Sequence, residues 1–501
     1  MAQILLAHAY FLKYDAKQVQ KMKPYPPLAT LIVANYLRSD GHTVALFDAM
    51  LSDGEHEFEA ALRAHQPSIV ILCDDNFNFL SKMCLSRMRE AALTMIDMAR
   101  KHGAVVIVAG SDASDHPEVY LAAGAHAVVV GESDHALFEL AERVSAGLPV
   151  CAPSVQGIAY LVDGAVHRTA PRPNEKHPDV FPLPAWDLIN VDAYRRAWRD
   201  ARGYFSLNMA STRGCPFHCN WCAKPIWGQR YAMRSPAKVA EEMAYIKREL
   251  QPDHIWFADD IFGLRAQWVA EFGREVAARD AAIPFMIQSR VDLMTDEAVA
   301  GLKQAGCTEV WLGAESGSQK ILDAMDKGTQ VAEIFAARAR LKRAGIRACF
   351  FIQFGYPGET FDDILLTVRM VREALPDNIG VSVSYPLPGT KFHGMVQAQM
   401  GAKSHWTDSD DLAMMFQGTY QSPFYRKLHQ VLHHDLDVHQ RVAHRNNGLR
   451  QERGAIRAQI SDLRREWREL CELEWSCRNI EPTALIKLDA PQAPDLSHTW
   501  N

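Results

Sequence analysis

Three cysteines, Cys215, Cys219 and Cys222, are the residues whose type and spacing point most directly to chemistry. They stand in the run Arg213-Gly-Cys-Pro-Phe-His-Cys-Asn-Trp-Cys222, with three residues between the first two and two between the last two. Iron–sulfur clusters are held by cysteine thiolates, usually four of them. Three ligands on one loop leave one iron of a 4Fe–4S cluster open, and an open iron can bind a substrate.

A structural zinc site is the alternative for these cysteines. Structural zinc takes four ligands, usually from paired Cys-x-x-Cys hooks. The sequence has no second hook, because Cys307 and Cys349 each stand alone and far from the loop. His218 lies between the first two cysteines, where its reach as a fourth ligand is poor. The spacing therefore favours the cluster.

The cysteine run, including the aromatic Trp221 before the third cysteine, closely resembles the motif of the radical S-adenosylmethionine (SAM) enzymes. The resemblance implies that the open iron chelates the amino and carboxylate groups of SAM. It also implies that an electron from the cluster cleaves SAM to methionine and a 5′-deoxyadenosyl radical, which acts on a small-molecule substrate. An electron donor such as flavodoxin or ferredoxin is then expected as a partner.

Length and composition set limits on the protein class. A chain of 501 residues is too long for one ordinary core and predicts two or three domains. The net charge is −6 with both signs interspersed, so no basic face for nucleic acid is expected. No apolar stretch could span a bilayer, and the N-terminus lacks a signal-peptide pattern. Ten cysteines without framework spacing predict a cytoplasmic protein, and the oligomeric state stays undetermined.

The first 150 residues alternate short apolar strands with helices. Strands are predicted at residues 3–7, 44–47, 69–73, 105–109 and 127–130. Helices are predicted at residues 28–39, 58–64, 87–102, 117–124 and 136–146. Such alternation predicts an α/β fold with a doubly wound parallel sheet, which binds its ligands at the carboxyl ends of the strands.

Five residues at the predicted strand and helix ends carry a second resemblance. Pro27 opens the first long helix, and the pairs Gly110-Ser111 and Gly131-Glu132 each follow a strand. Together they resemble the cobalamin-binding domain that precedes many radical SAM domains, where glycines let the backbone approach a large flat ligand. No Gly-x-Gly-x-x-Gly follows a strand, which weakens a dinucleotide site. On these residues alone, a plain doubly wound domain that binds nothing, or a nucleotide, stays open.

The sequence departs from one group of cobalamin proteins. Mutases and methionine synthase carry Asp-x-His-x-x-Gly, whose histidine ligates cobalt from below, and no such motif occurs here. After the first strand the chain instead reads His8-Ala-Tyr-Phe-Leu-Lys-Tyr14. The resemblance therefore implies cobalamin without a protein histidine as lower ligand. In this family, that state favours moving the methyl group by radical attack.

A proline-rich connector at residues 168–184 separates this region from a second series of strands. These strands are predicted at residues 205–211, 254–258, 285–289, 309–313, 348–354 and 380–385. Six strand–helix units make a partial barrel with its active site at the carboxyl ends of the strands. We therefore expect a cobalamin-binding domain (1–150), a linker (151–200), a partial (β/α)6 radical SAM barrel of TIM type (201–400) and a mainly α-helical C-terminal region (401–501).

Charged residues follow two of these strands. Asp259 and Asp260 stand where the family has a strand-end contact to the SAM amino group, and a carboxylate there would accept from an ammonium. Arg290 follows the third strand of this series and could hold the SAM carboxylate with both arms of its guanidinium. The alternatives are a helix N-cap pair for the two aspartates and a structural ion pair for Arg290.

Two further motifs match the family. Glu315, in Gly-Ala-Glu-Ser-Gly-Ser318, stands at the position that contacts the ribose hydroxyls of SAM. Gly355 and Gly358, in Gly355-Tyr-Pro-Gly-Glu359, resemble the glycine motif of the fifth strand, near the adenine. A simple turn before a helix is the alternative for these glycines.

The C-terminal hundred residues are less specific. His429, His433, His434, His439 and His444 crowd one helical stretch, which fits a solvated helix better than a metal site. Apolar residues at 460, 463, 467 and 470 predict a helix docked on the barrel or paired with another subunit.

The resemblance to cobalamin-dependent radical SAM enzymes covers roughly residues 1–430 and implies methylation of an unreactive carbon of a small molecule or natural product. The deoxyadenosyl radical would remove a hydrogen, and the carbon radical would take the methyl group from methylcobalamin. The alternative enzyme is a non-methylating cyclase or oxidase that resembles the anaerobic tetrapyrrole ring-forming enzymes. A cobalamin-binding or redox-sensing protein without turnover is the alternative of another class.

Overall fold

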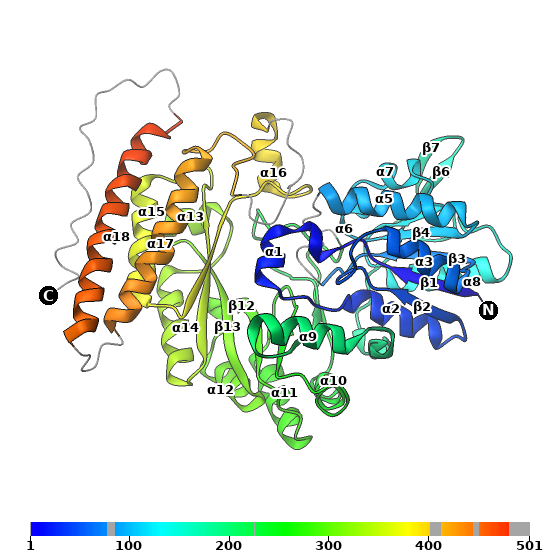
Figure 1. Ribbon diagram of the computed structural model, residues 1–501, viewed down its shortest axis with the longest axis horizontal. Coiled ribbons are helices and arrows are strands. Elements are labelled where there is room, and N and C mark those ends of the chain that lie inside the picture. Colours follow the sequence, from blue (N-terminus) through cyan, green and yellow to red (C-terminus); the bar gives the residue numbers. More distant parts are fainter. Residues whose placement is uncertain (1, 78–85, 225, 401–411, 444–449, 480–501) are drawn as a thin grey trace.

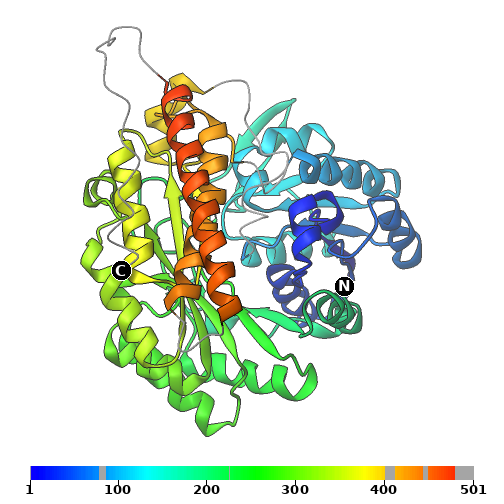
Figure 2. The ribbon, with the colours of Figure 1, turned by 60° about the vertical axis from the view of Figure 1, so that its left-hand side comes forward.

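The computed structural model describes residues 2–77, 86–224, 226–400, 412–443 and 450–479. Figure 1 shows two α/β units side by side, the first in blue and cyan and the second in green and yellow. Two long helices, orange and red, lie on the side of the second unit that faces away from the first, and Figure 2 shows them next to each other. The predicted fold class is confirmed.

Within the described residues, the N-terminal sheet has the strand order β2-β1-β3-β4-β5-β6-β7. Its parallel strands are β1 (Gln3–Ala7), β2 (Thr43–Phe47), β3 (Ile69–Cys73), β4 (Val105–Ala109) and β5 (Ala127–Val129). The strand order reverses between β1 and β3, and sheets of this kind bind ligands at the carboxyl ends beside such a reversal.

Helices cover both faces of this sheet, because successive residues of a strand point to opposite faces. Leu5 packs on one face and its neighbour Leu6 on the other. The helices on the Leu5 face are α3 (His56–His65), α5 (Ser86–Lys101) and α7 (Pro117–Ala122), and those on the Leu6 face are α2 (Leu28–Arg38) and α8 (Asp134–Ser145). The short helices α1 (Ala16–Lys21) and α6 (Ser111–Asp115) lie in loops. Full burial of β3 explains its continuous apolar sequence.

An antiparallel hairpin, β6 (Ile158–Val162) and β7 (Ala165–Arg168), extends the N-terminal sheet beyond β5. Its turn residues Asp163 and Gly164 have φ values of +50° and +80°, which suit a two-residue hairpin turn. The hairpin lies in the segment 151–200 that the sequence predicts as a linker. Two short β-prone runs around Asp-Gly were the signal for it.

The connector after the hairpin is fixed to α2. Asn35 Nδ2 donates to the carbonyl oxygen of Leu183 at 2.8 Å. Arg38 donates to both carboxylate oxygens of Asp187 at 2.9 Å. The chain then enters α9 (Val191–Arg202), which leads into the second sheet.

The second sheet has the strand order β15-β14-β13-β12-β11-β8 among the described residues, and all its neighbours pair in parallel. The strands are β8 (Ser206–Met209), β11 (His254–Phe257), β12 (Phe285–Arg290), β13 (Cys307–Glu315), β14 (Arg347–Phe354) and β15 (Asn378–Val383). The helices that follow them are α10 (Pro236–Glu249), α11 (Ala266–Ala278), α12 (Asp296–Ala305), α13 (Gln319–Ala324), α14 (Val331–Arg343), α15 (Phe361–Ala374) and α16 (Lys391–Val396). A short antiparallel pair, β9 (Thr212–Arg213) and β10 (Ala232–Met233), brackets the cysteine segment.

The C-terminal helices α17 (Ser422–Ala443) and α18 (Arg450–Ser476) pack on each other, and α17 also packs on α15. Leu463, Trp467 and Leu470 of α18 are buried, as the predicted docking face requires. The helix therefore docks within its own chain.

The histidines predicted to crowd one helix lie along α17. His429 and His433 are one turn apart, with ring centroids at 4.5 Å, and burial lowers the pKa of His433 to about 4. His434 Nδ1 lies 2.8 Å from a carboxylate oxygen of Glu466 on α18. His444 lies outside the described residues. His434 thus takes part in the packing of the two helices.

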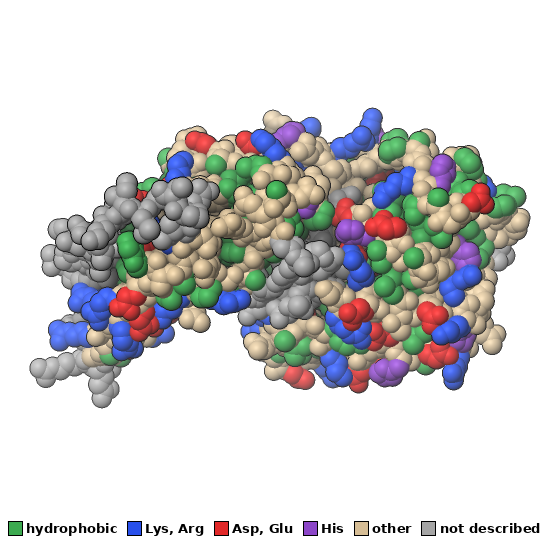
Figure 3. All heavy atoms as spheres, turned by 90° about the horizontal axis from the view of Figure 1, so that it is seen from above, with side chains coloured by type: hydrophobic (Ala, Val, Ile, Leu, Met, Phe, Trp, Pro, Cys, Tyr) green, Lys and Arg blue, Asp and Glu red, His purple; other side chains and the backbone are tan. Residues whose placement is uncertain are grey.

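The surface carries both signs of charge. On the face shown in Figure 3, acidic and basic side chains are interspersed. None of the helices in the described part of the chain combines the length and the apolar character needed to cross a membrane.

Asp435 ties the C-terminal helices to the barrel. It is fully buried and accepts hydrogen bonds from Arg372 Nε and NH2 at 2.9 and 2.5 Å and from Trp467 Nε1 at 2.7 Å. Burial alone would raise the pKa of this carboxyl, but Arg372 and His439 lower it to about 2.

Asp435→Asn should therefore leave the Arg372 guanidinium without its charge partner and cost about 3 kcal/mol of unfolding free energy. Asp437→Asn is the matched control, because Asp437 pairs with Arg441 on the same helix at an exposed site, where the expected cost is below about 1 kcal/mol. Urea unfolding of the two variants compares them. Equal midpoints would contradict this account of the helix docking.

Candidate active site

The three cysteines lie on one loop between β9 and β10, after the carboxyl end of β8, and all three are half-buried. Among the described residues, their sulfur atoms do not gather within 4.8 Å of one another, the spacing at which one metal ion could take all three. A zinc ion needs that spacing because its Zn–S bonds are about 2.3 Å long.

Asp259 fixes the start of the cysteine loop. It is buried, and its carboxylate accepts hydrogen bonds from Ser211 N and Oγ at 2.8 and 3.0 Å and from Thr212 N and Oγ1 at 2.5 and 2.6 Å. Burial raises the pKa of Asp259 to about 6, although the hydrogen bonds from Ser211 and Thr212 act in the opposite direction and lower it. Both carboxylate oxygens of this predicted SAM contact are thus engaged by the strand end that leads into the loop.

Asp260, the second predicted aspartate, is exposed. Burial, with a further contribution from the negative charge of Asp260, raises the pKa of Cys222 to about 12. Burial also raises the pKa of Cys215. A thiolate is the form that binds a metal, so these sulfurs need a metal or another positive charge beside them.

Asn220, inside the loop, was not singled out by the sequence analysis. Its Nδ2 donates to Ala324 O at 2.8 Å, and its Oδ1 accepts from the Tyr356 hydroxyl at 2.9 Å. Its backbone N donates to Met325 O at 3.0 Å. Tyr356 lies between the predicted glycines Gly355 and Gly358, so the turn after β14 is tied directly to the cysteine loop.

The turn after β14 requires its glycines. Gly355 and Gly358 have φ values of +77° and +82°. A Cβ on Gly355 would lie 3.1 Å from the Met414 sulfur and 3.2 Å from the Tyr425 ring. Glu359 closes the turn by accepting from Gly355 N at 2.6 Å, and burial raises the pKa of Glu359 to about 8.

Arg290 reaches the cysteine loop from the end of β12. Its NH1 donates to Cys219 Sγ at 3.8 Å, and its guanidinium carbon lies 3.8 Å from the ring centre of Phe217. Nε and NH2 donate to the two carboxylate oxygens of Asp292 at 2.9 and 3.1 Å. Asp292 thus takes the bidentate side of the guanidinium, formed by Nε and NH2, while NH1 places positive charge beside Cys219.

Glu315 lies at the end of β13 and is buried. Its Oε1 accepts a hydrogen bond from Lys327 Nζ at 2.8 Å, and both side chains are 6 % exposed. Lys327 was not singled out by the sequence analysis, because no local pattern reports a partner twelve residues away.

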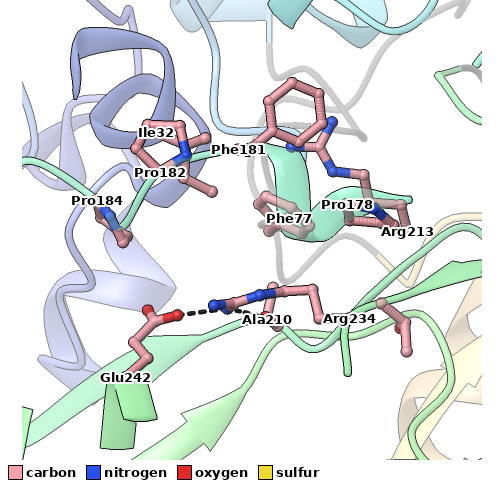
Figure 4. Close-up of a pocket in the computed structure, with 11 residues that line it drawn as sticks. Ile32, Phe77, Pro178, Phe181, Pro182, Pro184, Ala210, Arg213, Arg234 and Glu242 are labelled. Atoms are coloured by element: carbon pink, nitrogen blue, oxygen red, sulfur yellow. Dashed lines mark hydrogen bonds and ion pairs between the residues drawn. The ribbon is translucent and has the colours of Figure 1, made fainter. Parts of the chain in front are cut away.

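Arg213, two residues before the first cysteine, joins the two sheets. Its NH1 donates to Glu132 Oε1 at 2.6 Å and to Asp134 Oδ2 at 2.7 Å, and its NH2 donates to Asp134 Oδ1 at 3.0 Å. Burial disfavours the charged guanidinium, but the two carboxylates outweigh that effect and raise the pKa of Arg213. Figure 4 shows Arg213 beside Phe181, whose ring centre lies 4.2 Å from the guanidinium carbon.

The other predicted residues of the N-terminal sheet lie at its carboxyl edge. Pro27 precedes α2, Gly110 and Ser111 follow β4, and Gly131 follows β5. A Cβ on Gly110, whose φ is +151°, would lie 3.0 Å from Asp74.

Gly131 faces the barrel unit, since its Cβ would lie 3.6 Å from Ile226 O just after the cysteines. The Glu132 carboxylate, by contrast, is engaged by Arg213 and by the Glu175 amide.

Two family models match the chain. Residues 209–371 match the Radical SAM superfamily, and residues 23–141 match the B12 binding domain. The first range contains the cysteine loop, Arg290, Glu315 and the turn after β14, and the second contains Pro27 and the loops after β4 and β5. The chain therefore belongs to the radical SAM superfamily, among the members that carry a B12-binding domain before the radical SAM domain.

Several known proteins are similar over most of their length. An uncharacterized methyltransferase of Pyrococcus horikoshii is 26% identical over 374 residues, which cover 73% of this chain and 77% of that protein. An anaerobic magnesium-protoporphyrin IX monomethyl ester cyclase of Rubrivivax gelatinosus is 28% identical over 375 residues, which cover 73% of this chain and 65% of that protein. The solved radical SAM methyltransferase TsrM from Kitasatospora setae, with cobalamin and a 4Fe–4S cluster bound, shares the fold with a TM-score of 0.65 and 19% identity, over 80% of this chain and 75% of that one.

Arg213→Met should loosen both loops that Arg213 joins, because it leaves two buried carboxylates without their partner, at a cost of about 3–5 kcal/mol. Hydrogen exchange should rise at residues 130–135 and at 212–222 together. Arg38→Met is the matched control, since Arg38 and Asp187 form a two-pronged pair at an exposed site. Faster exchange in only one of the two loops would contradict the joining role of Arg213.

Proposed function

We propose that this protein is a cobalamin-dependent radical SAM methyltransferase that adds a methyl group to an unreactive carbon of a small-molecule substrate. The observation that carries the proposal is the buried contact of Arg213 with Glu132 and Asp134. It holds the loop of three cysteines against the strand ends of the B12-binding domain. A SAM-cleaving centre and a methyl carrier would thus face each other.

When bound, the cluster supplies the electron that cleaves SAM to a 5′-deoxyadenosyl radical, and cobalamin supplies the methyl group. The chain's own residues hold and orient these groups. Cys215, Cys219 and Cys222 offer three thiolates, and Arg290 places positive charge beside the second of them.

Three strand ends of the barrel would supply the contacts to SAM. The Glu315 carboxylate would accept from the ribose hydroxyls, and the glycine turn after β14 would contact the adenine. Asp260, the exposed carboxylate near the cysteines, would accept from the SAM amino group. Asp259 would position the start of the cysteine loop rather than contact SAM, because its carboxylate oxygens accept hydrogen bonds from Ser211 and Thr212.

The carboxyl edge of the N-terminal sheet would hold cobalamin, with Pro27 and the loops after β4 and β5 in contact with it. We propose that no protein histidine binds the lower face. His8, at the end of β1, is buried, and its Nε2 lies 2.9 Å from a carboxylate oxygen of Asp48 and 3.1 Å from Ala49 N. That nitrogen is thus engaged within the domain, which supports the proposal.

Radical ring formation is the second candidate, because a magnesium-protoporphyrin cyclase is among the relatives. The two functions differ in what becomes of the SAM methyl group. Either one requires an electron donor, such as flavodoxin or ferredoxin, and a reducing compartment such as the cytoplasm.

The test is to purify the protein without oxygen, with cobalamin supplied, and to add a strong reductant and SAM with a deuterated methyl group. Methyl transfer predicts bound iron, sulfide and corrin, and release of both 5′-deoxyadenosine and S-adenosylhomocysteine. Deoxyadenosine without S-adenosylhomocysteine would favour ring formation. Zinc in place of iron after anaerobic reconstitution would contradict both functions.

Cys222→Ser should remove most of the iron and abolish deoxyadenosine release, because it takes one of three cluster ligands. Cys471→Ser is the matched control, since Cys471 is a half-buried cysteine on α18. Iron content and visible absorption of the two variants compare them. Full iron content in Cys222→Ser would show that the loop does not hold the cluster.

A further inference from the structure

Lys327 is a buried lysine at the carboxyl edge of the barrel, in a position that the proposed function does not yet use. Its side chain is 6 % exposed, and lysine is almost never fully buried unless it is paired. Its partner is Glu315, at 2.8 Å. A buried ion pair of this kind needs a reason, because both groups have been taken out of water.

The backbone at Glu315 points to such a reason. Glu315 has a φ of +58°, a left-handed conformation that is uncommon for residues other than glycine. The pairing of β13 with β14 also shifts register between Gly313 and Glu315. Strained conformations persist where the surroundings hold them, and they cluster at functional sites. The bulge therefore aims the Glu315 carboxylate in a direction that a regular strand would not allow.

Gly313 makes room for this pair. A Cβ on Gly313 would lie 2.5 Å from Lys327 Nζ and 2.8 Å from Glu315 Oε1. The ammonium and the carboxylate thus meet directly over the Gly313 backbone, where any side chain would push them apart. Gly313, Glu315 and Lys327 therefore depend on one another: the ion pair needs the space that the absence of a side chain at Gly313 leaves.

Lys327 also connects this unit to the cysteine loop. Its carbonyl oxygen accepts from Arg290 NH1 at 2.8 Å, and the same NH1 donates to Cys219 Sγ. Burial lowers the pKa of Lys327, but the negative charges of Glu315 and Cys219 outweigh that effect and raise it. The side chain therefore carries its positive charge against Glu315, while its backbone is joined to Cys219 through Arg290.

We propose that Lys327 is a positioning residue for SAM: its ammonium holds the Glu315 carboxylate, over Gly313, in the orientation that receives the ribose hydroxyls. This inference rests on the proposed function and adds a residue to the site that recognises SAM. Without the ammonium, Glu315 would be an unpaired carboxylate in a buried, strained position, and its side chain would no longer be held in this orientation.

The test uses the full-length protein with its cluster assembled without oxygen. Lys327→Met removes the charge and keeps much of the apolar stem. Lys391→Met is the matched control, because Lys391 pairs with Asp326, the residue before Lys327, but is 69 % exposed. SAM affinity is measured by equilibrium dialysis with labelled SAM. Binding is followed independently by the change that SAM causes in the electron paramagnetic resonance spectrum of the reduced cluster.

Lys327→Met should keep its iron content and bind SAM about ten- to a hundredfold more weakly, the range for a lost hydrogen bond to a charged group. The spectral change on adding SAM should shrink in parallel, while Lys391→Met should behave like the wild type. Wild-type affinity in a cluster-loaded Lys327→Met protein would overturn the inference. Loss of the cluster itself in this variant would also overturn it, since the role would then be structural.

A double variant separates action through Glu315 from a direct contact of Lys327 with SAM. Glu315→Gln neutralises the carboxylate, so removing Lys327 in that background should weaken SAM binding by less than about threefold. A full, additive loss would mean that Lys327 does not act through Glu315. The two neutral residues also avoid an unpaired buried charge, which guards against simple misfolding. Failure of the wild type to bind a cluster or cleave SAM would instead reject the proposed function.

Discussion

The buried ion cluster of Arg213 with Glu132 and Asp134 is the constraint on which the rest of the structure depends. The two sheets meet at their carboxyl edges, where the apolar core of the barrel continues into N-terminal residues such as Tyr25 and Phe77. Within this contact, a buried guanidinium with two carboxylates adds a directional restraint. Such a cluster is costly to bury and more costly to break than to keep. It therefore acts less as a source of stability than as a device that sets one geometry, with the cysteine loop held beside Gly131.

The cysteine loop is held from three further directions. Asp259 fixes its first strand, Asn220 ties its middle to α13 and to the turn after β14, and Arg290 faces Cys219 from the end of β12. Each anchor comes from the carboxyl end of a different strand or from a neighbouring loop. A cluster bound there would thus be positioned by the whole barrel edge, and the residues expected to contact SAM share these anchors.

Much of this fold was predictable from the sequence, and the reasons are local. Strands such as Ile69–Cys73 and Val105–Ala109 are continuous apolar runs between helices, so their pattern alone defines them. The cysteine spacing is equally local. Arg213, Asn220 and Lys327 could not be assigned in the same way, because their partners lie far away in the sequence or across the two sheets. Asp259 shows the same limit, since its place at a strand end was predictable but the orientation of its carboxylate was not.

We expect the cluster and cobalamin to lie face to face across the interface at which Arg213 joins the two units. Electron paramagnetic resonance of protein loaded with both groups, with the cluster reduced and the cobalt divalent, tests it most directly. The two centres should show a magnetic interaction that disappears in Cys222→Ser and weakens in Arg213→Met. Two full signals without any interaction, or a cluster signal in protein that binds no corrin, would contradict it.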